Sequence, residues 1–305
     1  MMYYADHSRG KPYAKDPAVV KFKGKYWMYY SIPSYEDGRQ PDGWGIGIAV
    51  SDDLEQWERV GEMTAQHPYE INGICAPGAI VLNGSIHLFY QTYGNFPKDA
   101  ICHAVSEDGL HFERNKSNPV FSPTGEWNNG RAIDADVIIH QDQLFLYFAT
   151  RDPKGEIQMQ GVATAPLDSD FGAGAWTQAC DQSILKPELP WEGQCIEAAA
   201  TCKRNGKVFM FYAGAYNNWP QQIGCAVSED GVHFQRLFSE PLLPNGEPGS
   251  WNSSESGHPY LFEDEDQRTY LFFQGNNDNG ETWYLSYVEI GWEADGNIPV
   301  IIPPL

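Results

Sequence analysis

A segment that recurs five times at intervals of about sixty residues is the strongest constraint on the fold. Its copies begin at Asp16, Ala76, Asp134, Glu197 and His258, with 60, 58, 63 and 61 residues between successive starts. Each copy joins an apolar strand to an aromatic-rich strand through a polar turn, as in "DPAVVKFKGKYWMYYS". That is the pattern of a β-hairpin. Repetition of one supersecondary unit indicates a repeat architecture.

A second hairpin signal repeats in phase with the first. The segments "AVSDDLEQWERV", "AVSEDGLHFERN" and "AVSEDGVHFQRL", which start at residues 49, 104 and 226, each contain a strand ending in Ser, an acidic turn and an aromatic residue. We interpret these turns as structural fasteners. Each repeat therefore has four strands, and no helical periodicity intervenes. The chain is predicted to be an all-β, five-bladed β-propeller with four antiparallel strands per blade, formed as a single domain by residues 1–305.

Composition excludes several classes of partner. The chain of 305 residues has 41 Asp and Glu against 20 Lys and Arg, a net charge of −21, and no basic run. Nucleic acid and anionic membranes are poor partners for such a surface. The N-terminus lacks the cationic start and apolar core of a signal peptide, so a cytoplasmic location is expected. The six cysteines lack metal-type spacing and are expected to be reduced.

The five repeat starts are the candidate functional positions. In a propeller the inner strand of every blade lines the central channel, so Asp16, Ala76, Asp134, Glu197 and His258 are expected to converge at one mouth. Carboxyl groups that lie close together raise one another's pKa values, and burial disfavours their charged forms further. A carboxylate can instead pair with the imidazole. Such clusters are costly to fold and are therefore typical of functional sites. Glycoside hydrolysis uses such a set, with one carboxylate activating water or attacking carbon and another carboxyl protonating the leaving oxygen.

The motifs around these positions resemble those of the family 43 glycoside hydrolases and their clan, which also contains fructosidases. They are Asp-Pro at 16–17, "IDA" at 133–135, "IEA" at 196–198, "GHP" at 257–259 and the closing segment "EIGWEADGNIPVI" at 289–301. The resemblance extends over essentially the whole chain.

This resemblance implies roles for four residues. Asp16 corresponds to the general base, Asp134 to the residue that orients the acid and modulates its pKa, and Glu197 to the general acid. His258 corresponds to a histidine that in some relatives contacts a central cation or an ordered water. The implied reaction is single-step inversion on an α-L-arabinofuranoside or β-D-xyloside in an oligosaccharide, with base and acid carboxyls roughly 6.5 to 9.5 Å apart. No cofactor is required, and a structural calcium ion in the channel is a further expectation.

Two positions depart from the family pattern. Gly78, in "CAPGA", stands where many relatives have an acid, which points to altered substrate recognition in blade two. Asp136 competes with Asp134 for the modulator role, because residues two apart share a strand face. We favour Asp134 because it is in register with the other blade starts.

Several aromatic and basic side chains are secondary candidates for substrate binding. Trp127, Trp191 and Trp251 each precede a channel position at a similar distance and would either stack on a sugar or wedge between blades. Arg131 and Arg151 flank the acids of blade three, and Arg151 in particular would bind a substrate hydroxyl or neutralise the cluster.

Two other functions remain open. One is a retaining fructosidase-like enzyme with Asp16 as nucleophile, although the Asn-Asp-Pro-Asn and Glu-Cys signatures are missing. The other is a non-catalytic propeller that binds carbohydrate, which the glycine in blade two keeps open. The acids at three separate blade starts favour the inverting glycosidase.

Overall fold

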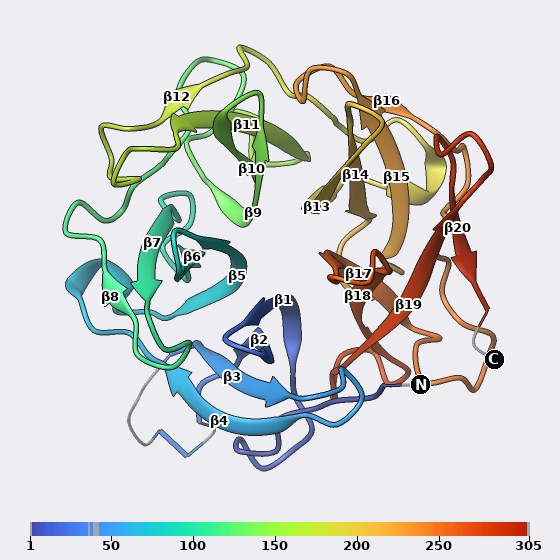
Figure 1. Cartoon of the computed structure of the whole chain (residues 1–305), viewed down its shortest axis with the longest axis horizontal. Coiled ribbons are helices and arrows are strands. Elements are labelled where there is room, and N and C mark those ends of the chain that lie inside the picture. The colour runs from blue at the N-terminus through green and yellow to red at the C-terminus, as the bar shows by residue number, and fades with distance from the viewer. Residues whose placement is uncertain (1, 36, 39–42, 304–305) are drawn as a thin grey trace.

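Five separate sheets make up the molecule. The computed structural model describes residues 2–35, 37–38 and 43–303, and in these residues every sheet has four strands that follow one another in the chain. Neighbouring strands within each blade pair antiparallel. Figure 1 shows the sheets arranged around a centre, with the first strand of each one innermost. The prediction of an all-β propeller with five four-stranded blades is confirmed.

Each blade runs from the channel outward in chain order. Blade one consists of β1 (Lys15–Phe22), β2 (Lys25–Ile32), β3 (Gly45–Ser51) and β4 (Glu58–Met63). Blade two consists of β5 (Ile74–Leu82), β6 (Ser85–Thr92), β7 (Ile101–Ser106) and β8 (Glu113–Arg114). Blade three consists of β9 (Ile133–His140), β10 (Gln143–Arg151), β11 (Gln158–Pro166) and β12 (Thr177–Gln178). Blade four consists of β13 (Ile196–Arg204), β14 (Lys207–Gly214), β15 (Gln222–Ser228) and β16 (Gln235–Arg236). Blade five consists of β17 (Glu255–Glu263), β18 (Thr269–Asn276), β19 (Tyr284–Trp292) and β20 (Pro299–Ile302).

Two short 3-10 helices, η1 (Pro68–Glu70) and η2 (Pro190–Glu192), precede the inner strands of blades two and four. No helix in the part of the chain that the structure describes is long and apolar enough to cross a membrane.

The second strand of each blade is buried on both faces, because each blade packs between its two neighbours. This explains why the second strand of every repeat is rich in aromatic residues. In blades one and three the buried tyrosines Tyr29 and Tyr147 donate hydrogen bonds to the carbonyls of Gly109 and Gly231 in the following blade, at 3.0 and 2.9 Å. The aromatic strands thus join consecutive blades.

The Ser-acidic turns are hairpin fasteners, as predicted. In blade two the Ser106 hydroxyl accepts the backbone N–H of Gly109 at 2.8 Å and donates to Asp108 Oδ1 at 3.0 Å. The same carboxylate accepts the backbone N–H groups of Leu110 and His111. Because these bonds are all local, the repeated turns serve the hairpins and not the channel.

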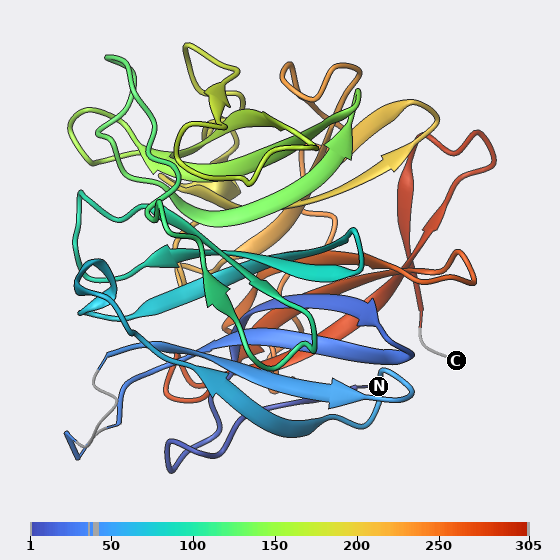
Figure 2. The ribbon, with the colours of Figure 1, turned by 60° about the vertical axis from the view of Figure 1, so that its left-hand side comes forward.

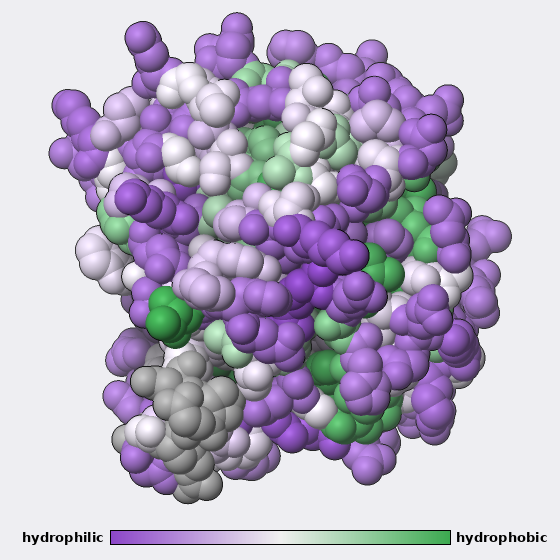
Figure 3. All heavy atoms as spheres, turned by 90° about the vertical axis from the view of Figure 1, so that its left-hand side faces the viewer, coloured by the Kyte–Doolittle hydropathy of each residue, from purple (hydrophilic) through white to green (hydrophobic). Residues whose placement is uncertain are grey.

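The ring closes without a strand shared between its first and last blades. Instead, the N-terminal segment lies along blade five, where Tyr4 and Leu285 exchange backbone hydrogen bonds at 2.9 and 2.8 Å. The two termini accordingly lie on the same side of the molecule in both Figure 1 and Figure 2. The space-filling view of one side, in Figure 3, is mostly hydrophilic with scattered hydrophobic patches. All six cysteines are free thiols.

Candidate active site

A kink at the channel end of every inner strand builds the site. In each of the five strands the pairing register slips by one residue, which is the mark of a β-bulge. The first bulged residue has a positive φ in all five blades: Asp16 (52°), Ala76 (46°), Asp134 (54°), Ala198 (52°) and His258 (42°). Non-glycine residues adopt this conformation at a cost, and such strain concentrates at functional sites.

Side chains from the preceding blade hold four of the five kinks. The backbone N–H of Asp134 donates to Gln91 Oε1 at 2.8 Å, and that of Asp16 donates to Gln274 Oε1 at 3.0 Å. The other two kinked residues are held in the same way, Ala76 by Ser31 Oγ and His258 by Gln221 Oε1. The kinks therefore do not depend on their own blade alone, because each is tied across a blade boundary.

Glu197 departs from the expected register. It pairs with Ala213 in the regular part of the ladder, and the positive φ falls on Ala198. Glu197 therefore occupies the same step of its repeat as Ile133, one residue before the step of Asp134. The prediction that Glu197 is in register with the other blade starts is wrong by one residue. The carboxylate still reaches the channel mouth, from the position just before the kink.

One cavity of about 190 Å³ collects the predicted residues. The residues that line it come from all five blades: Lys15, Asp16, Trp44, Cys75, Ala76, Gln91, Tyr93, Ile133, Asp134, Glu197, Asn217 and His258. The three carboxylates and the histidine are each at most 8% exposed. The structure therefore brings Asp16, Asp134, Glu197 and His258 together, as the repeat spacing predicts.

Asp16 is surrounded by positive or hydrogen-bonding groups. His258 Nδ1 lies 3.1 Å from Asp16 Oδ1. Burial by itself would raise the pKa of Asp16, but His258, the Lys15 ammonium and a hydrogen bond from Ser31 outweigh it, so this pKa lies below its usual range. Burial lowers the pKa of His258, although Asp16 and Glu197 oppose that shift.

Asp134 has the opposite environment. Burial, the charge of Glu197 and the charge of Asp16 together raise its pKa well above the usual range, and the opposing effects of Arg131 and Lys15 are smaller. Two carboxyl groups in one site whose pKa values are driven apart are typical of acid–base chemistry.

Glu197 is held by two glutamine amides that the sequence analysis missed. Gln221 Nε2 donates to Glu197 Oε1 at 2.7 Å, and Gln158 Nε2 donates to Glu197 Oε2. The side-chain carbonyl oxygen of Gln158 in turn accepts hydrogen bonds from Arg151 Nε at 3.1 Å and Arg131 Nη1 at 3.3 Å. Both arginines thus act on Glu197 through Gln158, and neither lines the carboxylate cavity.

The structure separates Asp136 and Gly78 from the pocket. Because the bulge falls between them, Asp134 and Asp136 do not share a face, and Asp136 accepts hydrogen bonds from the backbone N–H and the hydroxyl of Thr201 in blade four. At Gly78, a Cβ atom would lie 2.1 Å from the carbonyl oxygen of Ala135. This glycine permits the close approach of β5 to β9, and blade two instead presents Cys75, Ala76 and Gln91 to the cavity.

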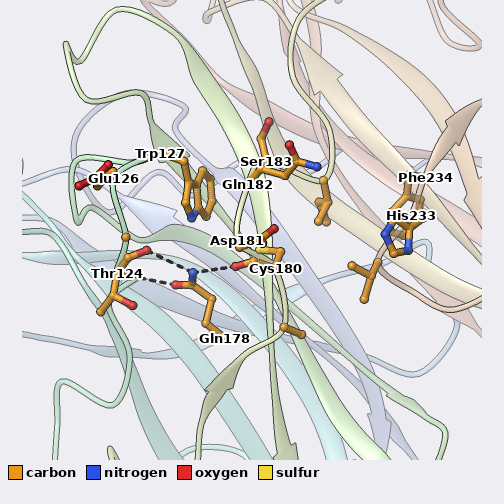
Figure 4. Close-up of a pocket in the computed structure, with 14 residues that line it drawn as sticks. Thr124, Glu126, Trp127, Gln178, Cys180, Asp181, Gln182, Ser183, His233 and Phe234 are labelled. Carbon is orange, nitrogen blue, oxygen red and sulfur yellow. Dashed lines mark hydrogen bonds between the residues drawn. The ribbon is translucent and has the colours of Figure 1, made fainter.

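The three tryptophans that were predicted to bind substrate lie outside the carboxylate pocket, and their rings pack against glycines in the blades. A Cβ atom at Gly214 would meet the Trp191 ring at 2.3 Å, and one at Gly275 would meet the Trp251 ring at 2.5 Å. Trp127 covers Gly161 and borders a rim cavity of about 770 Å³ between blades three and four, shown in Figure 4, which shares no residue with the carboxylate pocket. The aromatic side chains of the pocket itself are Trp44 and Tyr93.

Some of the hydrogen-bonding side chains that the sequence analysis missed do have a signal in the sequence. Ser31 lies 15 residues after Asp16, and Gln91 lies 15 residues after Ala76, so a polar side chain recurs at the end of the second strand of the repeat. Gln158 and Gln221 have no such repeat position and require the fold to be known.

The pocket does not fit the calcium ion expected from the resemblance. Among the residues that the structure describes, no group of three or more His, Cys, Asp or Glu side chains is arranged to hold a metal ion. His258 offers nitrogen, whereas calcium prefers oxygen ligands, and its Nδ1 already contacts Asp16.

Comparisons with known proteins identify the family of the chain. The model of glycosyl hydrolases family 43 matches residues 10–298. The chain is 25% identical, over 222 residues, to the 1,2-beta-oligomannan phosphorylase of Thermoanaerobacter sp. (strain X514), covering 70% of this chain and 68% of that protein.

Solved structures share the fold. An endo-1,4-beta-xylanase from Bacteroides thetaiotaomicron superposes with a TM-score of 0.74 at 21% identity, covering 95% of this chain and 94% of that one. An alpha-L-arabinofuranosidase from Lactobacillus brevis superposes with a TM-score of 0.73 at 17% identity, covering 96% and 94%.

Proposed function

The chain belongs to glycosyl hydrolase family 43 and is a glycosidase, and from this membership we propose that it hydrolyses an arabinofuranosyl or xylosyl bond of an oligosaccharide with inversion of configuration. The observation that carries the proposal is the cavity in which Asp16, Asp134 and Glu197 meet. The xylanase and arabinofuranosidase structures support the choice of sugars only through their common fold.

In the proposed mechanism Asp16 is the general base. Its lowered pKa keeps it ionised, so it can accept a proton from a water molecule as the water oxygen attacks the anomeric carbon. His258 contributes by holding the carboxylate and favouring its charged form.

Glu197 is the proposed general acid. It gives its proton to the glycosidic oxygen as the bond from that oxygen to the anomeric carbon breaks, so one proton leaves the water at Asp16 and another reaches the leaving group at Glu197. The amides of Gln158 and Gln221 fix the direction of the Glu197 carboxyl. Asp134, whose pKa is raised in part by the charge of Glu197, is the proposed modulator, because protonation of one member of this pair affects the other.

Phosphorolysis is the second candidate function, because the curated relative is a phosphorylase. A phosphate that attacks the anomeric carbon would have to occupy the place next to Asp16. An ionised carboxylate there repels an anion, and Arg131 and Arg151 are engaged with Gln158, which leaves the Lys15 ammonium as the cation that lines the pocket. One ammonium beside the carboxyl groups of Asp16, Asp134 and Glu197 favours water over phosphate, so hydrolysis fits this pocket better.

The retaining and non-catalytic alternatives make different predictions. In a retaining enzyme Asp16 would attack the sugar itself, and the product would keep its configuration. A carbohydrate-binding propeller would not need Asp16 and Asp134 to have pKa values shifted in opposite directions.

The deciding experiment is a substrate panel with and without inorganic phosphate. We would assay aryl glycosides and arabino-, xylo-, galacto-, fructo- and 1,2-β-manno-oligosaccharides. Cleavage of an arabinoside or xyloside without phosphate supports the proposal. Cleavage that requires phosphate supports phosphorolysis, and binding without cleavage in either condition supports the non-catalytic reading.

A further inference from the structure

A loop connects the carboxylate pocket to a second cavity. The loop, residues 215–221, follows β14 in blade four, and its Asn217 lines the carboxylate pocket. Its Ala215, Tyr216 and Trp219 line a neighbouring cavity of about 340 Å³. One short segment thus borders both spaces.

Trp219 is held with its side chain in solvent. It is 76% exposed, more than any other large hydrophobic residue in the described part of the chain. Its ring and that of Tyr216 form a T-shaped pair, with 6.3 Å between centroids and an interplanar angle of 82°, and the 76% exposure of Trp219 leaves most of the indole available to another partner. An exposed indole of this kind is typical of a binding surface.

The loop is anchored at several points. The backbone N–H of Trp219 donates to the Tyr216 carbonyl at 3.0 Å, and Gln221 Nε2 donates to the Ala215 carbonyl at 2.9 Å. The buried carboxylate of Glu255 accepts the backbone N–H of Asn218. Trp219 therefore projects from a fixed support, which reduces the entropy lost when it binds a ligand.

The cavity lies on the side of the general acid. Gly193 and Gln194 line it and come immediately before β13, the strand that carries Glu197. Tyr216 is close enough to Glu197 and Arg151 for their charges to affect its pKa, which burial raises. The Arg151 guanidinium lies 5.4 Å from the centre of the Tyr216 ring. The leaving group of the substrate, whose oxygen receives the proton of Glu197, would therefore extend toward this cavity.

We propose that this cavity binds the sugar of the leaving group, with Trp219 as the stacking platform. The inference rests on the proposed function, because it takes Glu197 as the acid. The lining has no charged side chain and includes the rings of Trp191, Tyr216 and Trp219 and the side-chain amides of Gln194 and Gln222. Aromatic rings with amides from Gln194 and Gln222 suit a neutral sugar, whose C–H face stacks while its hydroxyls form hydrogen bonds. The substrate class is then a neutral oligosaccharide with at least one sugar beyond the cleaved bond.

The test compares two substrates that differ only in their leaving group. One is the oligosaccharide cleaved in the panel, and the other is the glycosyl fluoride of the same sugar, whose leaving fluoride does not fill the cavity. For Trp219→Ala we expect KM to rise about 5- to 15-fold on the oligosaccharide, with kcat/KM on the fluoride within about twofold of wild type. Trp219→Phe should be intermediate, and Ile302→Ala, a change at a 41% exposed residue of β20, should leave both unchanged. Equal losses on both substrates, or no loss on the oligosaccharide, would overturn the inference.

A binding measurement separates failure of this inference from failure of the proposed function. Xylotriose and arabinotriose are titrated against the intrinsic fluorescence of wild type and Trp219→Phe. We expect a saturable change in wild type that is much smaller in the variant, where Trp44 and Trp191 remain, even if neither protein cleaves the sugar. The same signal in both proteins, or none in wild type, would show that Trp219 does not bind these sugars.

Discussion

His258 Nδ1 and Asp16 Oδ1 lie 3.1 Å apart, although the two residues come from the last and the first blade. The contact bridges the seam where the propeller closes and helps to keep the Asp16 carboxylate charged. The chemistry proposed for Asp16 therefore depends on closure of the ring.

The first prediction follows from this contact. Asp16 must be ionised to act as a base, so activity is lost as the pH falls through its pKa, which lies below the usual value of about 3.9. His258→Gln removes one cause of that lowering, and the acidic limb of kcat/KM should move to higher pH. The exposed His233 offers a matched control, since His233→Gln should leave the limb in place. An unshifted limb in His258→Gln would contradict the assignment.

Glu197→Gln should lose activity according to the leaving group. With an oligosaccharide, whose leaving oxygen needs a proton, we expect kcat to fall by about two to four orders of magnitude. With a glycoside of an acidic phenol the loss should be much smaller. Glu229→Gln, at an exposed glutamate of blade four, serves as the control. Equal losses on both kinds of leaving group would argue against general acid catalysis by Glu197.

Gln158 should act as a positioning residue. Gln158→Leu removes a donor to Glu197 and the acceptor shared by Arg131 and Arg151. We expect kcat on the oligosaccharide to fall about tenfold, the cost of one hydrogen bond, with KM changed less than twofold. The loss should be much smaller with a glycoside of an acidic phenol, because that leaving group needs little protonation. A purely structural role for Gln158 would lower the melting temperature and reduce activity equally on both kinds of leaving group.

Gly78→Ala should destabilise the fold. The added Cβ would overlap the Ala135 carbonyl of the next blade, and overpacking of this kind costs about 1–3 kcal/mol. Gly174 is a matched control, because a Cβ there meets nothing within 4 Å and its φ is not in the left-handed region. Chemical denaturation of both variants measures the difference, and equal stability would mean that blades two and three can separate without cost.

Asp136→Asn should change how stability depends on pH. Burial raises the pKa of Asp136 to about 7 in spite of the Thr201 hydrogen bonds, whereas the unfolded value is about 3.9. The folded state therefore binds this proton more tightly, so the contribution of Asp136 is fully present below about pH 4 and is lost as the pH rises to about 7. Relative to Asp136→Asn, the melting temperature of wild type should fall over that window and then level off. A constant difference between the two proteins from pH 4 to 8 would contradict the raised pKa.

The repeats predicted the blades because each hairpin is encoded locally, by alternating apolar residues and a polar turn. They placed Asp16, Ala76, Asp134 and His258 correctly, because the bulge occurs at the same step of four repeats. At Glu197 the bulge falls one residue later. The similar triplets "IDA" and "IEA" hid this shift, because a bulge depends on the partner strand as well as on its own residues.

The support of the site could not be predicted in the same way. Gln158 reaches Glu197 from the beginning of β11, through the packing of blade three against blade four, and Gln221 reaches it from the loop before β15 within blade four. The spacing of Trp127, Trp191 and Trp251 suggested the channel mouth, but the glycines that these rings cover lie within the sheets. An aromatic residue before a strand packs well in either environment, and neighbouring residues decide between them.

The most direct test of the central claim is proton NMR of the first product formed by wild type from the substrate found in the panel, recorded before mutarotation in phosphate-free buffer. We predict that the anomeric configuration is inverted relative to the substrate, as expected when Asp16 activates water and Glu197 protonates the leaving group. A first product with retained configuration, or no product until phosphate is added, would contradict that account.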